Sequence, residues 1–277
     1  MTIAAAYLTS EGVVLGADST TAVVGRQGSG PTSILQLFNY GQKVFEIGEK
    51  SHLGLCTWGA GIVGETSHRT IAARLGRWVE EQKSATVAMV AEHLVEMVKG
   101  LLQSGQGIKD PLGYYVGGWC PADSLPACFR ILLDPDASVQ TVPMALGEAN
   151  FSGAPRFFTR VFRGFDQELP RRLEQALAER LGLPLEEIKP KVEEAFAEAA
   201  GPLVAAGSRD IPIREAIDFV YSYLHITVKA YKFQFGAPIC GGPIEVAFIS
   251  SDRPFRWVRH KRFDAAIRGQ EADCDER

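Results

Sequence analysis

The sequence predicts an α+β fold in which antiparallel sheets pack against helices, and three observations support this prediction. Hydrophobic patterning gives the order strands, two helices, strands, helices and strands, which differs from the regular strand–helix alternation of parallel α/β proteins. The first twenty residues show two strand patterns around a turn signal at residues 10–12, which indicates an antiparallel hairpin. The chain has 277 residues, 46% of them hydrophobic, and this is enough to build a large core.

The strands are indicated by short runs of β-branched and apolar residues that are bounded by turn signals. Between them, the segments 25–31 and 147–155 read as loops, and the second of these leads into a helix. Strands are expected at 2–9, 12–19, 43–47, 53–58, 116–118, 129–133, 139–142, 244–249 and 255–258.

Apolar residues at helical spacing predict the helices. One stripe lies within 71–79 and a longer one within 87–102, and both are expected to face a core. Asp210 is expected to cap a long helix whose apolar stripe occupies 213–228. The stretch 166–206 is rich in Leu, Ala, Glu and Arg, so we expect it to add further helices.

The chain is expected to form a single domain over residues 1–267. No internal repeat and no long Gly/Ser linker divides it, so the helical stretch 166–206 is expected to be an insertion within that domain. Residues 268–277 form a polar tail that we expect to be disordered.

Composition argues against several classes of partner. The net charge is −4, so no basic excess is present to bind nucleic acid, and the basic run 253–262 reads as a solvated strand or an assembly contact. No apolar run approaches the roughly 20 residues that a membrane span needs. The N-terminus lacks the basic start and long apolar stretch of a signal peptide, so a cytoplasmic location is expected.

Metal and cofactor motifs are not found in the sequence. The histidines have no metal-ligand spacing, and no P-loop, GxGxxG or GxSxG motif occurs, so neither a metal nor a cofactor is expected. The cysteines are scattered and odd in number, which predicts reduced and mostly buried thiols rather than disulfides. They are Cys56, Cys120, Cys128, Cys240 and Cys274.

Three residues are expected to form a catalytic group. Thr2 becomes the first residue if Met1 is removed, and a small second residue permits that removal. A hairpin turn near residues 10 and 11 places Thr2 opposite roughly residues 18–20, which include Asp18, although the sequence does not fix the register. Lys43 begins the next predicted strand.

An N-terminal threonine carries both a nucleophile and a base. Its hydroxyl attacks, and its free α-amine, whose pKa is roughly 8, accepts the proton. The Lys43 ammonium would lower the pKa of that amine and favour a developing alkoxide, and the Asp18 carboxylate would keep the lysine charged and fixed. A backbone N–H from the glycine-rich turn after Trp58 would complete the group as an oxyanion hole.

The order and spacing of several segments resemble the proteasome β-type branch of the N-terminal nucleophile (Ntn) hydrolases, over most of the chain. An N-terminal Thr is followed, sixteen residues later, by the Asp. The matching segments are EGVVLGADS at 11–19, QKVFEIG at 42–48, LGLCTWGAG at 53–61, YVGGW at 115–119 and GGPIEVAFI at 241–249.

The resemblance assigns roles to the candidate residues. Thr2 matches the family's catalytic threonine, Asp18 its lysine-orienting aspartate and Lys43 its catalytic lysine, while Gly59 or Gly61 matches the oxyanion-hole glycine. It implies a four-layer αββα sandwich of two antiparallel sheets, the Ntn-hydrolase fold, here with the helical insertion. It also implies peptide-bond hydrolysis through an acyl-enzyme ester, and assembly of copies into a ring or related homo-oligomer.

Three further residues are expected to support the site. Ser19 follows the aspartate directly. Glu148 either hydrogen-bonds near the site or caps a helix, and it lies in a GE-x-x-aromatic segment that resembles the bacterial Anbu-type branch rather than the family's usual Gly-Ser-Gly. Cys240 stands at a family serine position, and Ala237 stands where the family has an aspartate.

The favoured hypothesis is therefore a proteasome-like threonine peptidase acting on peptides or unfolded proteins. One alternative is a catalytically silent, self-assembling structural subunit, which the missing aspartate favours. The other is an acyl-transferring Ntn enzyme, in which an amine instead of water resolves the acyl-enzyme. The sequence identifies no unfoldase partner.

Overall fold

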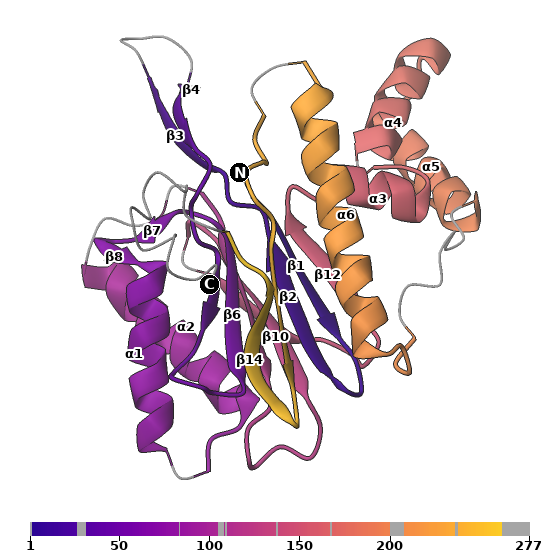
Figure 1. The fold of residues 1–277 in the computed structure, drawn as a ribbon. Coiled ribbons are helices and arrows are strands. Elements are labelled where there is room, and N and C mark those ends of the chain that lie inside the picture. Colours follow the sequence, from indigo (N-terminus) through magenta and orange to yellow (C-terminus); the bar gives the residue numbers. More distant parts are fainter. Residues whose placement is uncertain are drawn as a thin grey trace, which may run out of the picture.

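The N-terminal hairpin lies in the first of two five-stranded sheets in the computed structural model (Figure 1). The structure describes residues 2–26, 32–82, 84–104, 108, 110–136, 138–166, 168–199, 208–235 and 238–261. All strand pairs of this first sheet are antiparallel. In pairing order its strands are β12 (Ala149–Gly153), β1 (Ile3–Leu8), β2 (Gly12–Ala17), β13 (Glu245–Ser250) and β14 (Arg253–Arg259).

The hairpin has the predicted turn, and its register falls within the predicted neighbourhood. The backbones of Thr9 and Gly12 close the turn, with the amide of Thr9 donating to the carbonyl of Gly12 at 2.9 Å. Ala4 pairs with Ala17, which sets Ile3 beside Asp18. Every residue of β1 and β2 is buried, because other elements cover both faces of this hairpin.

The second sheet is also antiparallel and contains both predicted strands on either side of the turn at 48–51. The amide of Ile47 donates to the carbonyl of Leu53 at 3.1 Å across that turn, and Lys43 directly precedes the first of the two strands. In pairing order the strands are β11 (Val139–Pro143), β10 (Ala127–Leu133), β9 (Leu112–Gly118), β6 (Leu53–Gly59) and β5 (Val44–Glu46).

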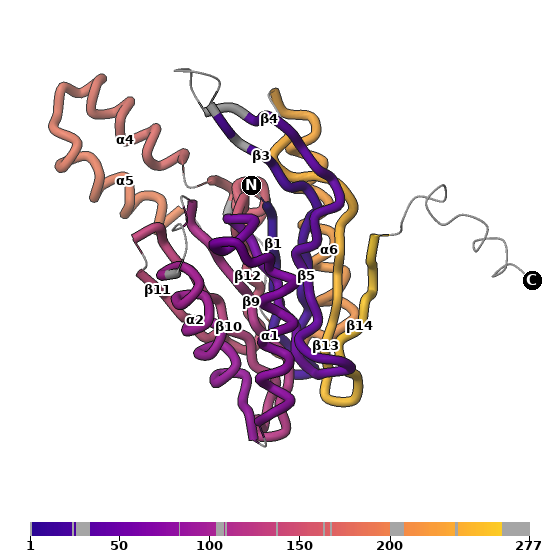
Figure 2. Tube along the Cα trace, turned by 90° about the vertical axis from the view of Figure 1, so that its left-hand side faces the viewer, coloured from indigo at the N-terminus to yellow at the C-terminus, as the bar shows by residue number. Residues whose placement is uncertain are grey.

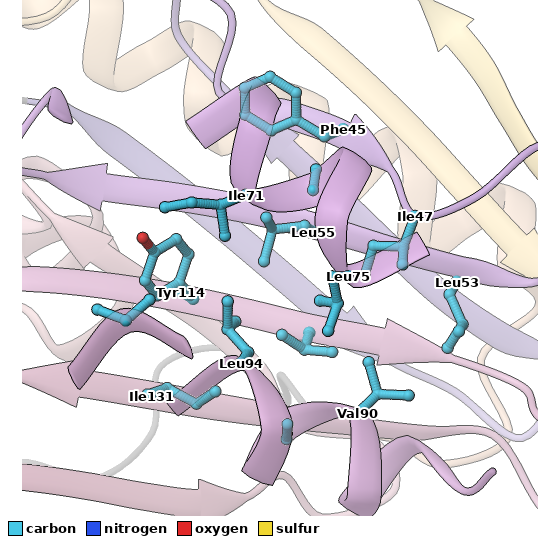
Figure 3. Close-up of a cluster of buried hydrophobic side chains, with 14 of the residues drawn as sticks. Phe45, Ile47, Leu53, Leu55, Ile71, Leu75, Val90, Leu94, Tyr114 and Ile131 are labelled. Carbon is cyan, nitrogen blue, oxygen red and sulfur yellow. The ribbon is translucent and has the colours of Figure 1, made fainter. Parts of the chain in front are cut away.

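Helices α1 (His68–Glu81) and α2 (Val87–Ser104) pack against the second sheet. Figure 3 shows Ile71 and Leu75 of α1 and Leu94 of α2 gathered around Leu55 and Tyr114, which come from the sheet. These side chains are buried, so the two predicted apolar stripes do face a core. Ser67 caps α1, since its side chain accepts a hydrogen bond from the amide of Thr70.

Helices α6 (Ile213–Phe233) and α3 (Arg156–Arg163) pack on the other side of the molecule, against the first sheet. Figure 1 shows the strands lying between α1 and α2 on one side and α6 on the other. A separate buried cluster joins the two sheets, with Leu15 from the first and Cys56 and Tyr115 from the second. The hydrophobic core therefore consists of several clusters, one of which contains residues of both sheets.

The predicted helical stretch contains α4 (Glu168–Leu181) and α5 (Leu185–Ala199). Figure 2 shows this helical pair extending away from the sheets. Buried Asp166 anchors its start, because one carboxylate oxygen accepts hydrogen bonds from the amides of Glu168 and Leu169 and the other binds two arginine side chains. Pro190 lies inside α5, and residues 200–207 lie outside the described residues.

One segment that reads as a loop contains a strand, and the other begins within a strand, so these predictions were wrong in part. The segment 147–155 contains β12, which lies at the edge of the first sheet. Phe151 is its only buried residue, so the strand lacks the alternation of apolar and polar residues that would have revealed it. Next to the segment 25–31, β3 (Thr21–Arg26) and β4 (Thr32–Phe38) form a hairpin that Figure 1 shows projecting from the sheets. Residues 27–31 lie outside the described residues.

The cap predicted for the long helix was also wrong. Helix α6 begins at Ile213 with Pro212 at the cap position, so Asp210 does not cap it. Instead the amide of Ile213 donates to the carboxylate of Glu11 at 2.9 Å. Glu11 lies in the β1–β2 turn, more than two hundred residues earlier, so local sequence could not indicate this contact.

The segment after β6 forms a small hairpin of β7 (Ile62–Val63) and β8 (Thr66–Ser67) that leads directly into α1. Among the helices that the structure describes, none is long and apolar enough to cross a membrane. The polar tail 268–277 lies outside the described residues.

Candidate functional site

Thr2 and Asp18 lie next to each other across the N-terminal hairpin. The amide of Ile3 donates to Oδ1 of Asp18 at 3.2 Å, and the amide of Asp18 donates to the carbonyl of Ile3 at 3.1 Å. Both Thr2 and Asp18 are buried. The hairpin register therefore brings the nucleophile candidate and the aspartate together, as the sequence predicts.

Lys43 joins this pair from the second sheet. Its Nζ lies 2.7 Å from Oδ1 of Asp18 and 2.6 Å from the carbonyl oxygen of Thr20. The carbonyl of Lys43 accepts a hydrogen bond from the amide of Thr57 at 2.9 Å, which holds the lysine backbone against β6. Two of the three donors of the ammonium are thus used to fix its position.

The Asp18 carboxylate is fully buried and has partners on both oxygens. Its second oxygen, Oδ2, accepts hydrogen bonds from the amides of Thr20 at 3.2 Å and Gly241 at 2.9 Å. With the amide of Ile3 and Nζ of Lys43 on Oδ1, four donors hold this carboxylate in place. The contacts of Nζ with Asp18 and with the carbonyl of Thr20 keep Lys43 in one position.

A cavity of about 90 Å³ opens beside these residues. Thr2 and Lys43 line it together with the turn that contains Gly59 and Gly61, and with His68 from the start of α1. The structure therefore brings Thr2, Lys43 and both candidate oxyanion-hole glycines to one cavity. Asp18 lies behind Lys43 and fixes it.

The strand register distinguishes the two glycines. The amide of Trp119 donates to the carbonyl of His52, so even-numbered residues of β6 direct their backbone groups toward β9. Odd-numbered residues face β5, as the bond from the amide of Thr57 to Lys43 shows. Gly59 is also an odd-numbered residue of β6. Its N–H is therefore directed toward β5, the side on which Lys43 and the cavity lie.

Gly59 also requires glycine for steric reasons. Its φ is +88°, and a Cβ there would lie 1.9 Å from the carbonyl oxygen of Pro111. At Gly61, by contrast, a Cβ would meet no atom within 4 Å.

Gly59→Ala is therefore expected to destabilise the protein by about 1–3 kcal/mol or more, whereas Gly61→Ala should change stability by about 0.5 kcal/mol or less. Chemical denaturation of the two variants, side by side with the parent protein, measures this difference. Equal stability of the two variants would contradict the assigned backbone geometry.

The three supporting candidates lie in different places. Ser19 is fully buried beside Asp18, and its amide donates to the carbonyl of Gly241 at 3.0 Å. Cys240 precedes that glycine and packs in the cluster under α6, where burial raises the pKa of its thiol far above the usual range. It is a buried neutral thiol near the Asp18 contacts.

Glu148 is not part of the group, so its expected place near the site was wrong. Its carbonyl accepts from the amide of Leu8, at the opposite end of β1 from Thr2, and the length of β1 is about 17 Å. Its carboxylate binds the amide of Ala145 at 2.9 Å and the side chain of Asn150 at 3.2 Å, so it stabilises its own turn.

Several residues at the site were missed from the sequence, among them Thr20, whose carbonyl accepts from Lys43, and also Gly153 and His68. Gly153 pairs with Ile3, and its φ of +88° lets the chain pass so close to Thr2 that a Cβ would lie 2.0 Å from the Thr2 carbonyl oxygen. The Ser-Gly pair at 152–153 was the signal for this position. His68 had no signal, because only the folding of the β7–β8 hairpin brings it to the cavity.

Four described cysteines, Cys56, Cys120, Cys128 and Cys240, are free and buried. Within the part of the chain that the structure describes, no group of three or more His, Cys, Asp or Glu side chains is arranged to hold a metal ion.

Comparison with solved structures finds a similar fold in two Anbu (ancestral beta-subunit) structures. Anbu (ancestral beta-subunit) from Yersinia bercovieri is 13% identical, with a TM-score of 0.50 over 94% of this chain and 88% of that one. A Gly-1 mutant of Anbu from Hyphomicrobium sp. strain MC1 is 12% identical, with a TM-score of 0.52 over 99% of this chain and 94% of that one. No family model and no curated protein matches the sequence. At these identities the likeness is one of fold.

Proposed function

We propose that this chain is a proteasome-like threonine peptidase whose nucleophile is Thr2 after removal of Met1. The observation that carries the proposal is the shared cavity, where Thr2 meets a buried ammonium fixed 2.7 Å from Asp18 and the Gly59 amide is directed to the same side. The likeness in fold to an ancestral beta-subunit supports it. Met1 itself lies outside the described residues.

In the proposed reaction, Oγ of Thr2 attacks the scissile carbonyl carbon while the free α-amine takes the hydroxyl proton. The carbonyl electrons move to oxygen, which accepts a hydrogen bond from the amide of Gly59. Breakage of the C–N bond passes the proton to the leaving nitrogen and leaves an ester on Thr2. Water, with the amine again as base, then hydrolyses the ester and restores the enzyme.

Lys43 serves this chemistry through its charge. A nearby ammonium lowers the pKa of an α-amine, ordinarily about 8, so that more of the amine is unprotonated at neutral pH. It also stabilises the developing alkoxide on Thr2. Because Asp18 and the carbonyl of Thr20 hold Nζ, no reorganisation is needed during the reaction.

The complete fold is proposed to be the four-layer αββα Ntn sandwich with the helical insertion. Buried clusters beneath α1 and α2, between the sheets, and beneath α6 support this arrangement. Assembly into a homo-oligomer and action on cytoplasmic peptides or unfolded proteins complete the proposal. Light scattering of the purified protein tests the assembly, and a monomer would contradict it.

The experiment for the activity combines two mass measurements. Intact mass first reports whether Met1 has been removed. A peptidyl β-lactone is then added, and attack by Oγ of Thr2 opens the lactone ring, so the protein gains the whole mass of the probe. The expected result is one added probe on the Met1-free chain and none on Thr2→Ala.

Two outcomes oppose this function. Retention of Met1 in the native protein defeats the mechanism, since the α-amine would then belong to Met1. A Met1-free protein that stays unlabelled favours the silent structural subunit. The absence of the family's aspartate before Cys240 is the sequence feature that suggests this alternative. Acyl transfer gives the same labelling, and product analysis with an added amine distinguishes it from hydrolysis.

A further inference from the structure

We propose that His68 is a positioning residue that holds the turn Gly59–Ala60–Gly61 in the shape the reaction needs, an inference that rests on the proposed function. His68 lines the same cavity as Thr2, yet both of its ring nitrogens bind protein atoms. Nε2 lies 2.8 Å from the carbonyl oxygen of Ala60, and Nδ1 lies 3.1 Å from the hydroxyl of Tyr114. Nε2 therefore binds the turn, and Nδ1 anchors the ring to Tyr114 of β9.

The partners fix which nitrogen carries the hydrogen. A carbonyl oxygen only accepts, so Nε2 must donate to Ala60. Nδ1 of the neutral ring then accepts from the hydroxyl of Tyr114 on β9, which is fully buried. Burial lowers the pKa of His68 and raises that of Tyr114, so at neutral pH the ring is neutral and the hydroxyl keeps its proton.

The bond to Ala60 sets the direction of the whole turn. In a trans peptide the C=O and the following N–H point in opposite directions. Holding the Ala60 carbonyl toward His68 therefore directs the Gly61 N–H away from His68, and it prevents the carbonyl dipole from turning toward the developing oxyanion. Glycine on both sides of Ala60 gives the turn wide conformational freedom, which this one contact reduces.

His68 is itself firmly held. It is the first residue of α1, and Ser67 immediately before it caps the helix. Its ring packs edge-on against Tyr114, with centroids 5.6 Å apart. The chain from β6 through the β7–β8 hairpin thus returns after eight residues and closes on its own turn.

Two matched variants test this role. His68→Leu fills the space with an apolar side chain and removes both hydrogen bonds. His68→Gln has a side-chain amide that can donate to Ala60 and accept from Tyr114. Because a misplaced group near the reacting atoms costs roughly 10²-fold, His68→Leu is expected to lower kcat by about that factor with KM changed by less than about threefold. His68→Gln is expected to recover most of the loss. Tyr114→Phe, which leaves the bond to Ala60 in place, is expected to have a smaller effect.

A second readout does not depend on activity. Deuterium uptake of a peptide spanning residues 59–63 is expected to be faster in His68→Leu than in the parent protein, and close to the parent in His68→Gln. Unchanged uptake in His68→Leu overturns the inference, as does full activity of that variant. Absence of labelling in the parent protein defeats the proposed function alone, because the uptake measurement still tests the contact.

Discussion

Lys43→Met is expected to slow acylation of Thr2 by about 10²–10⁴-fold, the range seen when a proton-transfer or charge-stabilising group is lost. Methionine keeps much of the apolar stem but carries no charge. In the proposed mechanism the α-amine would then lose a neighbouring ammonium and the alkoxide a stabilising cation, since Lys43 lines the same cavity as Thr2. The rate of β-lactone labelling, followed by intact mass, measures the effect.

The control separates chemistry from folding. Lys229→Met removes a lysine from the exposed surface of α6 and should label at the parent rate. Lys43→Met should remain folded, because Asp18 keeps three amide donors, from Ile3, Thr20 and Gly241. Labelling of folded Lys43→Met at the parent rate would exclude Lys43 from the mechanism.

The second large effect is expected at a buried ion pair behind the site. Glu245 of β13 is fully buried, and its Oε2 lies 2.7 Å from Nζ of Lys261 while its Oε1 lies 2.6 Å from Nδ1 of His260. Neither oxygen has a partner with hydrogen-bond angles, and the contact with Lys261 is an ion pair. Nζ of Lys261 also donates to the carbonyl of Gly41 at 3.1 Å and lies 3.4 Å from Oγ of Ser19.

Lys261→Met is expected to lower the free energy of unfolding by about 3–5 kcal/mol, because it leaves the Glu245 carboxylate buried with one exposed histidine as partner. Glu245→Gln alone should destabilise for the converse reason. The double variant should lose less than the sum of the two single changes, since neither charge remains. Urea denaturation of all three measures the coupling, and strictly additive losses would contradict a direct interaction.

The sequence predicted the parts of the site that depend on local patterns. The β1–β2 turn limits the partner of Thr2 to about three residues by chain connectivity, and the observed register selects Asp18 among them. The turn between β5 and β6 likewise places Lys43 at the end of the sheet where β6 finishes at Gly59. The apolar stripes of α1 and α2 predicted buried faces because their period is helical.

Predictions failed where a strand lacks alternation or where the partner is distant in sequence. The edge strand β12 gave no periodic signal and was read as a loop, and Gly153 at its end lies beside Thr2. Of the two alternatives for Glu148, the one near the site was wrong. The cap of α6 comes from Glu11, across most of the chain. Such contacts depend on which elements pack together, and the pattern of a short sequence segment does not indicate its distant partners.

By itself the sequence determined the α+β class, the N-terminal hairpin and the group Thr2, Asp18 and Lys43, because turns and short-range periodicity constrain neighbouring residues directly. Tertiary structure alone decided that the odd-numbered residues of β6 face β5, that His68 lines the cavity and binds Ala60, and that Lys261 lies beside Ser19, 242 residues away. The physical reason is that two properties are fixed only when the sheets and the last strand have packed together. These are the direction of each backbone N–H along a strand and the burial of the Glu245 and Lys261 side chains.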